Sequence, residues 1–187
     1  MGGLSSLQQL FCGGCGRLEQ LSDSLGRLSS LSGLDLSGCR RLNVLPNSIT
    51  ALGELADLSL VACKGLTALP AAIGGLGRLQ QLDLSWCEHL VALPDNVSGL
   101  TSLQRLSLHG CRRLKQLPGS IGCLTALHSL DLGDCRNLVS LPVALSAVGS
   151  LSQLELRGCR RLAMSSGGIH SFLGGAVLSG HCSAKAR

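Results

Sequence analysis

The stretch LDLSGCRRLNVLP, residues 34–46, holds four leucines, one cysteine, two arginines and one proline. Its beginning, LDL, alternates apolar and polar residues, which is the side-chain period of a β-strand. Beyond Pro46, the apolar residues Ile49 and Leu52 are spaced by three, which suits a short helix or a 3-10 turn. A proline just before such a turn is typical of a helix start. The stretch therefore predicts a strand, a turn and a short helical return.

The same arrangement returns every 24 residues along most of the chain. The cysteines that keep this step are Cys15, Cys39, Cys63, Cys87, Cys111, Cys135 and Cys159. Leucines and prolines keep it too, and the unit reads LxxLxLxxCxxLxxLPxxIxxL. A fixed period of this length indicates a solenoid. Because one unit cannot bury its apolar face alone, we expect the units to stack and to pair their strands in a parallel sheet.

This unit resembles the leucine-rich repeat family, over residues 4 to about 163. The CxxLxxLPxxIxxL variant is similar to the repeats of plant intracellular immune receptors, which join a nucleotide-binding domain to leucine-rich repeats. It is also similar to the Ras-associated leucine-rich-repeat scaffolds of plants and animals. The resemblance implies an α/β horseshoe with about seven parallel strands on its concave face and short helical or 3-10 segments on its convex face. The GxxxxGK[ST] phosphate loop of the receptors is absent from this chain.

The repeat pattern divides the chain into two parts. We expect a solenoid over residues 1–163 and a degenerate last repeat with a flexible tail over residues 164–187, because Ser165 and Ser166 replace the expected Leu-Pro pair. The chain begins in mid-repeat without a polar cap, and solenoids need caps for solubility. We therefore expect a fragment, a truncated product, or an array that self-associates through its uncapped ends.

The ten cysteines do not predict a disulfide scaffold, because side chains in register point in parallel instead of toward one another. In the family that the sequence resembles, the cysteine slot turns inward, so we expect each S–H to meet a neighbouring carbonyl. Cys12-x-x-Cys15 is half of a zinc or redox motif, without a second half. Cys123 lies out of phase and is the candidate exposed thiol.

The expected location is the cytoplasm. The chain shows no secretory signal and no apolar run long enough to span a bilayer, and its unpaired cysteines suit a reducing compartment. MGGLSS fits the myristoylation pattern at Gly2, although the in-phase GLTSLQRL indicates that the repeat alone explains these residues.

Partners of the resembled family usually meet the concave face, so we expect a protein ligand there. The candidate contact residues are Phe11, Asp35, Asp57, Ser59, Asp83, Ser85, Trp86, Arg105, Ser107, His109, Asp131, Glu155 and Arg157. Their central column is mostly acidic and small, which suits a basic protein patch and equally an ordinary solvated strand face. Trp86, the only tryptophan, is either an interface anchor or a ring that lies flat on its neighbours.

A second column of side chains follows the cysteines and forms a basic rim. Its members are Arg40, Arg41, Lys64, Arg112, Arg113, Arg136, Arg160 and Arg161. An anionic partner is conceivable there, in a chain of net charge +5. We do not expect nucleic acid, because aromatic residues make up only 2 % of the chain and stacking platforms for bases are lacking.

No catalytic or metal-ligating constellation is recognisable, so we expect a non-catalytic module without a cofactor. The five histidines are scattered, and Asp35, Asp83 and Asp131 stand on alternate repeats instead of forming a close pair. The resemblance implies recognition of a protein in plant-type defence or its regulation. The alternative is an intracellular signalling scaffold that binds a small GTPase or a phosphatase.

Overall fold

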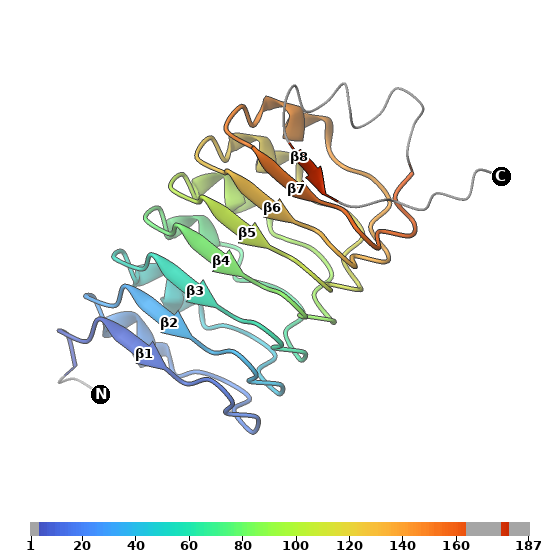
Figure 1. Cartoon of the computed structure of the whole chain (residues 1–187). Helices are drawn as coiled ribbons and strands as arrows, with labels where there is room; N and C mark the ends of the chain where they lie inside the picture. The colour runs from blue at the N-terminus through green and yellow to red at the C-terminus, as the bar shows by residue number, and fades with distance from the viewer. Residues whose placement is uncertain (1–3, 164–176, 180–187) are drawn as a thin grey trace.

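The computed structural model describes residues 4–163 and 177–179, and within them the chain winds into stacked coils with one strand each (Figure 1). The strands are β1 (Gln9–Phe11), β2 (Gly33–Asp35), β3 (Asp57–Ser59), β4 (Gln81–Asp83), β5 (Arg105–Ser107), β6 (Ser129–Asp131), β7 (Gln153–Glu155) and β8 (Val177–Ser179). They form one parallel sheet in chain order, each strand pairing with the next at an offset of 24 residues. The expected seven strands are therefore present, together with an eighth that the sequence pattern did not predict.

Short 3-10 helices return the chain behind the sheet, on the opposite side of the coils (Figure 1). They are η1 (Asp23–Arg27), η2 (Asn47–Ala51), η3 (Ile73–Gly75), η4 (Asp95–Gly99), η5 (Gly119–Cys123) and η6 (Val143–Ala147). A proline precedes η2, η4, η5 and η6 directly, and its extended backbone leads into the turn. The three-residue spacing of apolar side chains matches the 3-10 period of three residues per turn, so these segments do not become α-helices.

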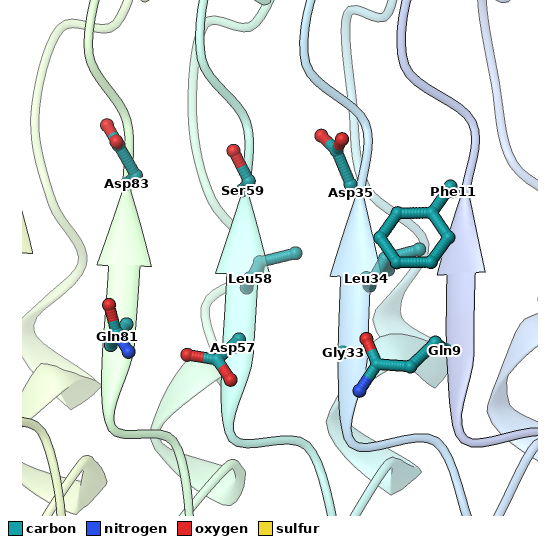
Figure 2. Close-up of a pocket in the computed structure, with 10 residues that line it drawn as sticks. All are labelled: Gln9, Phe11, Gly33, Leu34, Asp35, Asp57, Leu58, Ser59, Gln81 and Asp83. Atoms are coloured by element: carbon teal, nitrogen blue, oxygen red, sulfur yellow. The ribbon is translucent and has the colours of Figure 1, made fainter.

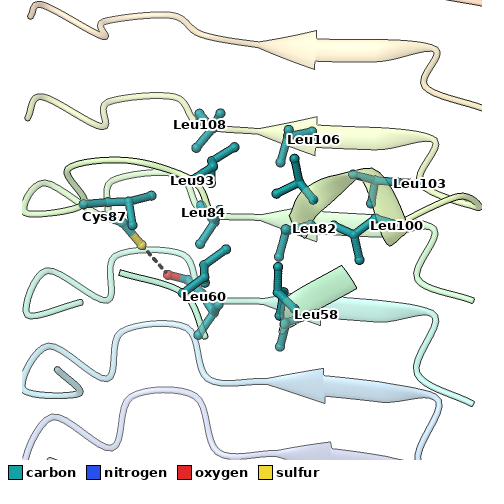
Figure 3. Packing of buried hydrophobic residues seen from close by; sticks show 14 of the residues in the cluster. Leu58, Leu60, Leu82, Leu84, Cys87, Leu93, Leu100, Leu103, Leu106 and Leu108 are labelled. Atoms are coloured by element: carbon teal, nitrogen blue, oxygen red, sulfur yellow. Dashed lines mark hydrogen bonds between the residues drawn. The ribbon is translucent and has the colours of Figure 1, made fainter. Parts of the chain in front are cut away.

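Leucines fill the core in columns that run along the solenoid. The central residues of β2–β7 point inward, and Leu34, Leu58 and Leu82 are each only 2 % exposed. Figure 3 shows the leucines of neighbouring coils packed in register between the sheet and the helical side. Among the described residues the core contains no buried polar or charged side chain. Each coil thus buries its apolar face against the next coil, as the 24-residue period predicts.

The cysteine column confirms the predicted role of the thiols. Cys63, Cys87, Cys111, Cys135 and Cys159 are buried, and each Sγ donates to the backbone carbonyl 27 residues earlier, at 3.0–3.2 Å. Figure 3 shows one such bond, from Cys87 to Leu60. Among the described residues, the cysteines Cys12, Cys15, Cys39, Cys63, Cys87, Cys111, Cys123 and Cys135 are free thiols. The column therefore links adjacent coils by hydrogen bonds and not by disulfides.

Burial raises the pKa of the column thiols, with neighbouring thiols as a further cause. The pKa of Cys63 rises from 9.0 to about 11 and that of Cys87 to about 12. Because the thiolate is the reactive form, these side chains are chemically quiet spacers. Cys15 differs from the rest of its column, since it is exposed, and Cys123 is exposed as expected.

One column of backbone positions has a left-handed conformation. Gly14, Gly38, Gly110 and Gly158 have φ between 71° and 80°, and the equivalent Ala62, Trp86 and Asp134 have φ between 53° and 62°. The turn between strand and cysteine requires this conformation in every coil, and glycine alone adopts it without a steric cost. Of this column, the sequence-based predictions consider only Trp86 and do not include the left-handed backbone.

Among the described residues, no helix is long and apolar enough to cross a membrane. The expected degenerate repeat and flexible tail at 164–187 lie outside the described residues, apart from the backbone of β8.

Candidate functional site

Three columns of side chains cover the concave face of the sheet. Two come from the residues that flank the inward leucine of each strand, and the third lies two positions beyond the strand end. Their members are exposed or half-buried, except the small Gly33 and Gly133. The candidate contact residues lie on or beside one face of the sheet, apart from Trp86, which lies at its rim.

The acidic residues of the central column have a structural role in the turns. Oδ1 of Asp35 accepts a hydrogen bond from the Ser37 amide at 2.8 Å, and the same bond forms between Asp83 and the Ser85 amide. Asp131 accepts from the Gly133 amide at 2.7 Å. A carboxylate that bonds the backbone two residues later stabilises a turn locally. This column is therefore acidic partly because it caps the turn after each strand.

Serines take the place of the carboxylates in alternate coils and join neighbouring strands instead. The hydroxyls of Ser37 and Ser59 lie 2.8 Å apart, and those of Ser85 and Ser107 lie 2.7 Å apart. These hydroxyl pairs run across the sheet, so the polar face is ordered by contacts between coils.

A shallow hollow of about 240 Å³ lies over β1–β4. Its wall and floor are formed by Gln9, Phe11, Gly33, Leu34, Asp35, Asp57, Leu58, Ser59, Gln81 and Asp83. Figure 2 shows Phe11 and Gln9 on β1 lying beside β2, with carboxylates on the strands that follow. Phe11 is 74 % exposed, although an aromatic ring normally gains stability from burial. The hollow thus combines an accessible aromatic ring with three carboxylates over the strands.

A second group of side chains surrounds Trp86 at the edge of the concave face. The rings of Trp86 and His109 meet edge to face, with centroids 5.1 Å apart, and the Arg112 guanidinium lies 5.6 Å from the indole centroid. His109 lies 3.5 Å from Asp131 and 4.0 Å from Asp134. Trp86 is half-buried, so the ring both packs on its neighbours and keeps an accessible part.

The basic rim is interrupted by acidic side chains. Glu88 stands in phase with Lys64 and Arg112 and pairs with both, at 2.9 Å and 3.6 Å. The hydrogen bond from Lys64 lowers the pKa of the Glu88 carboxyl. Arg41 and Arg136 likewise have acidic neighbours, Glu19 at 3.4 Å and Asp134 at 3.5 Å. Exposed ion pairs of this kind contribute at most about 1 kcal/mol each to stability. The rim is therefore a polar edge of mixed charge.

The candidate contact residues separate into groups along the sheet. Phe11, Asp35, Asp57, Ser59 and Asp83 line the hollow. Ser85, Trp86, Arg105, Ser107, His109 and Asp131 lie over β4–β6, and Glu155 and Arg157 stand at β7.

Several residues of the site were not predicted from the sequence. Gln9 and Gln81 line the hollow and occupy its outer column, and Glu88 bridges two rim cations. The 24-residue period could have revealed the role of Glu88, because Lys64, Glu88 and Arg112 occupy the same position in successive repeats.

The described part of the concave face is an open surface without a metal-binding group. Within the described ranges, His, Cys, Asp and Glu form no group of three that could hold a metal ion. The hollow is open and shallow, and none of its residues pairs a nucleophile with a base.

Comparison with known proteins supports the fold. The Leucine Rich Repeat family matches residues 102–124. The leucine-rich repeat domain of the type III effector XopL is 30 % identical, with a TM-score of 0.69, over 94 % of this chain and 69 % of that one. A leucine-rich repeat protein of Leptospira interrogans is 25 % identical, with a TM-score of 0.59, over 95 % of this chain and 51 % of its own. No curated protein sequence matches the chain.

A plant structure is similar as well. The Arabidopsis receptor kinase HAESA, in complex with the peptide hormone IDA and the co-receptor SERK1, is 26 % identical over 74 % of this chain and 23 % of that one, with a TM-score of 0.54. The period, the parallel sheet and the 3-10 returns define a repeat solenoid of the kind that serves as a protein–protein interaction module. The chain belongs to the leucine-rich repeat family.

Proposed function

We propose that the chain is a non-catalytic module that recognises a protein ligand through its concave face. The observation that carries this proposal is the presence of two accessible or partly accessible aromatic side chains on the strand side of the solenoid, Phe11 on β1 and Trp86 just beyond β4. Only three residues of the whole chain are aromatic, one Trp and two Phe. Aromatic side chains are enriched among the residues that dominate binding energy.

We place this recognition in intracellular defence or its regulation. The support is the likeness of the CxxLxxLPxxIxxL unit to the repeats of plant immune receptors, together with a column of free thiols that suits a reducing compartment. The basic rim is part of the proposal only as a polar edge, because acidic neighbours occupy several of its cations.

Affinity capture from the native cell with matched variants tests the proposal. The bait chains are the wild type, a concave variant with Phe11→Ala and Trp86→Ala, and a control with Val143→Ser, whose exposed side chain lies in η6 on the opposite side. We expect one partner to be retained by the wild type and the control and lost from the concave variant. Equal retention by all three would contradict the concave site, and retention of a nucleotide-loaded small GTPase would favour the signalling-scaffold alternative over defence.

A further inference from the structure

We propose that the hollow over β1–β4 receives an arginine side chain from an extended basic segment of the protein partner. This inference rests on the proposed function and adds the chemistry of the ligand. Its first support is the charge of the hollow. Asp35, Asp57 and Asp83 lie on the successive strands β2, β3 and β4. The outer two strands, β2 and β4, are about 9–10 Å apart.

Within residues 4–163 these carboxylates form no ion pair, although the chain has 16 basic residues against 11 acidic ones. The ion pairs of the described residues engage Glu19, Glu54, Glu88, Asp131 and Asp134, and none of them reaches the hollow. An external cation is therefore the group that would complete this part of the surface.

The hydrogen bonds of the hollow leave carboxylate oxygens available to a ligand. In Asp35 and Asp83 the turn amides engage Oδ1 at 2.8 Å, so Oδ2 is not engaged by these bonds. Asp57 makes no side-chain hydrogen bond or ion pair within residues 4–163, and it is exposed. The turn bonds also fix two of the three carboxylates in place, which reduces the entropy lost on binding.

The apolar part of the hollow suits a side chain with a long stem and a flat charged end. The exposed Phe11 ring forms one wall and supplies the apolar surface, while Leu34 and Leu58 border the hollow at the strands and point their side chains inward (Figure 2). An arginine can lay its methylene stem on apolar surface, stack its guanidinium on a ring and donate to carboxylates in the same plane. A lysine ammonium lacks the flat face and the paired donors.

Gly33 shapes the edge of the hollow that is formed by Gln9. A Cβ on Gly33 would overlap the side-chain amide of Gln9, so only glycine lets that amide lie over β2. Gln9 is held there by a hydrogen bond from its Nε2 to the Ser32 hydroxyl at 3.0 Å. The Gln9 amide therefore takes the place of a side chain at position 33 and borders the hollow beside Asp57, the next residue of the outer column.

The charge on β5 limits the hollow on its other side. Arg105 donates to Gln81 at 3.1 Å and so places a cation at the boundary of β4 and β5. A basic segment is attracted to β2–β4 and repelled from β5, which confines it to the first strands of the sheet.

The test uses three terminally blocked tripeptides, Arg-Arg-Arg, Lys-Lys-Lys and citrulline-citrulline-citrulline, titrated into the full chain. Backbone amide NMR shifts report the binding place and the affinity together. We expect the arginine peptide to shift the amides of Gly33, Leu34 and Leu58, to bind at least about threefold more tightly than the lysine peptide, and to weaken as salt rises. Binding of the citrulline or lysine peptide as tightly as the arginine peptide would overturn the inference.

Matched variants locate the site. Asp57→Asn removes a carboxylate that has no structural bond, and we expect it to weaken arginine-peptide binding by about two- to fivefold. Phe11→Leu should weaken it by a similar factor. Asp95→Asn, which alters an exposed carboxylate of η4 on the opposite side, is the control and should change nothing. Equal binding by Asp57→Asn and Asp95→Asn would refute the site, whereas the proposed function would still stand if the captured partner were lost from the concave variant.

Discussion

Replacing Ala62 by glycine should stabilise the protein, contrary to the usual effect of glycine in a folded chain. Ala62 has a φ of 57° in the left-handed column, where an L-residue with a Cβ is disfavoured by about 1–2 kcal/mol. Glycine removes this cost and raises the entropy of the unfolded chain by an equivalent of about 0.4–1 kcal/mol. The difference predicts a gain of about 0.5–1 kcal/mol in the free energy of unfolding.

Ala56→Gly is the matched control. Ala56 is half-buried like Ala62, in the same coil, but its φ is not positive. There glycine brings only the entropic cost, so we expect a loss of about 0.5–1 kcal/mol. Gly38→Ala tests the reverse change in the neighbouring coil. Its φ is 74° and an added Cβ would find its nearest atom 3.5 Å away, so strain without a clash should cost about 1 kcal/mol.

Urea unfolding followed by circular dichroism measures the three free energies. The expected order is Ala62→Gly above the wild type, and both Ala56→Gly and Gly38→Ala below it. If Ala62→Gly lost as much stability as Ala56→Gly, the left-handed column would not be a source of strain, and the reasoning from φ would be refuted.

Further predictions concern Gly110 in the left-handed column and the cysteine thiols. A Cβ on Gly110 would lie 2.6 Å from the Trp86 ring, so Gly110→Ala should cost about 1–3 kcal/mol, and the loss should shrink when Trp86→Ala is added; equal losses in both backgrounds would contradict the contact. In native protein a thiol reagent should modify Cys123 readily and leave Cys63 and Cys87 unmodified until urea is added; prompt labelling of either column thiol would contradict the burial. Folding raises the thiol pKa of Cys63 to about 11 and that of Cys87 to about 12. The free energy of unfolding should therefore be unchanged below pH 9 and should fall by about 1.4 kcal/mol per pH unit per thiol above pH 9. A free energy of unfolding that stays constant from pH 9 to 10.5 would exclude this linkage.

The core was predictable because its residues repeat with the fold. Leu34, Leu58 and Leu82 occupy the same slot, so identical letters at a fixed step establish both the burial and the parallel register. The inward thiol was predictable for the same reason, since small apolar character fits a slot lined by carbonyls. β8 was not predicted, because Ser165 and Ser166 break the pattern before it, although Leu178 keeps the 24-residue step from Leu154.

The site was less predictable because its residues do not repeat. Which carboxylate caps a turn depends on the rotamer of a single side chain, as for Asp35, and no periodic signal encodes that choice. One edge of the hollow depends on Gly33, because the Gln9 amide lies where a side chain at that position would be, and this contact is visible only when Gln9 is placed on the neighbouring strand. The left-handed column was visible as a recurrence of glycine, but Ala62 and Trp86 obscured it.

The bond from each column thiol to a carbonyl 27 residues earlier has an evolutionary consequence. Every coil meets its predecessor through the same contacts, so a gene that loses or duplicates one whole unit, for example residues 60–83, rejoins matching ends. The leucine columns would pack across the junction as before. The repeats beyond the junction would lie one strand nearer to or farther from Phe11. The number of repeats would then change the distance between exposed side chains in steps of about 4.8 Å. New binding surfaces could evolve in this way without substitutions in the hydrophobic core.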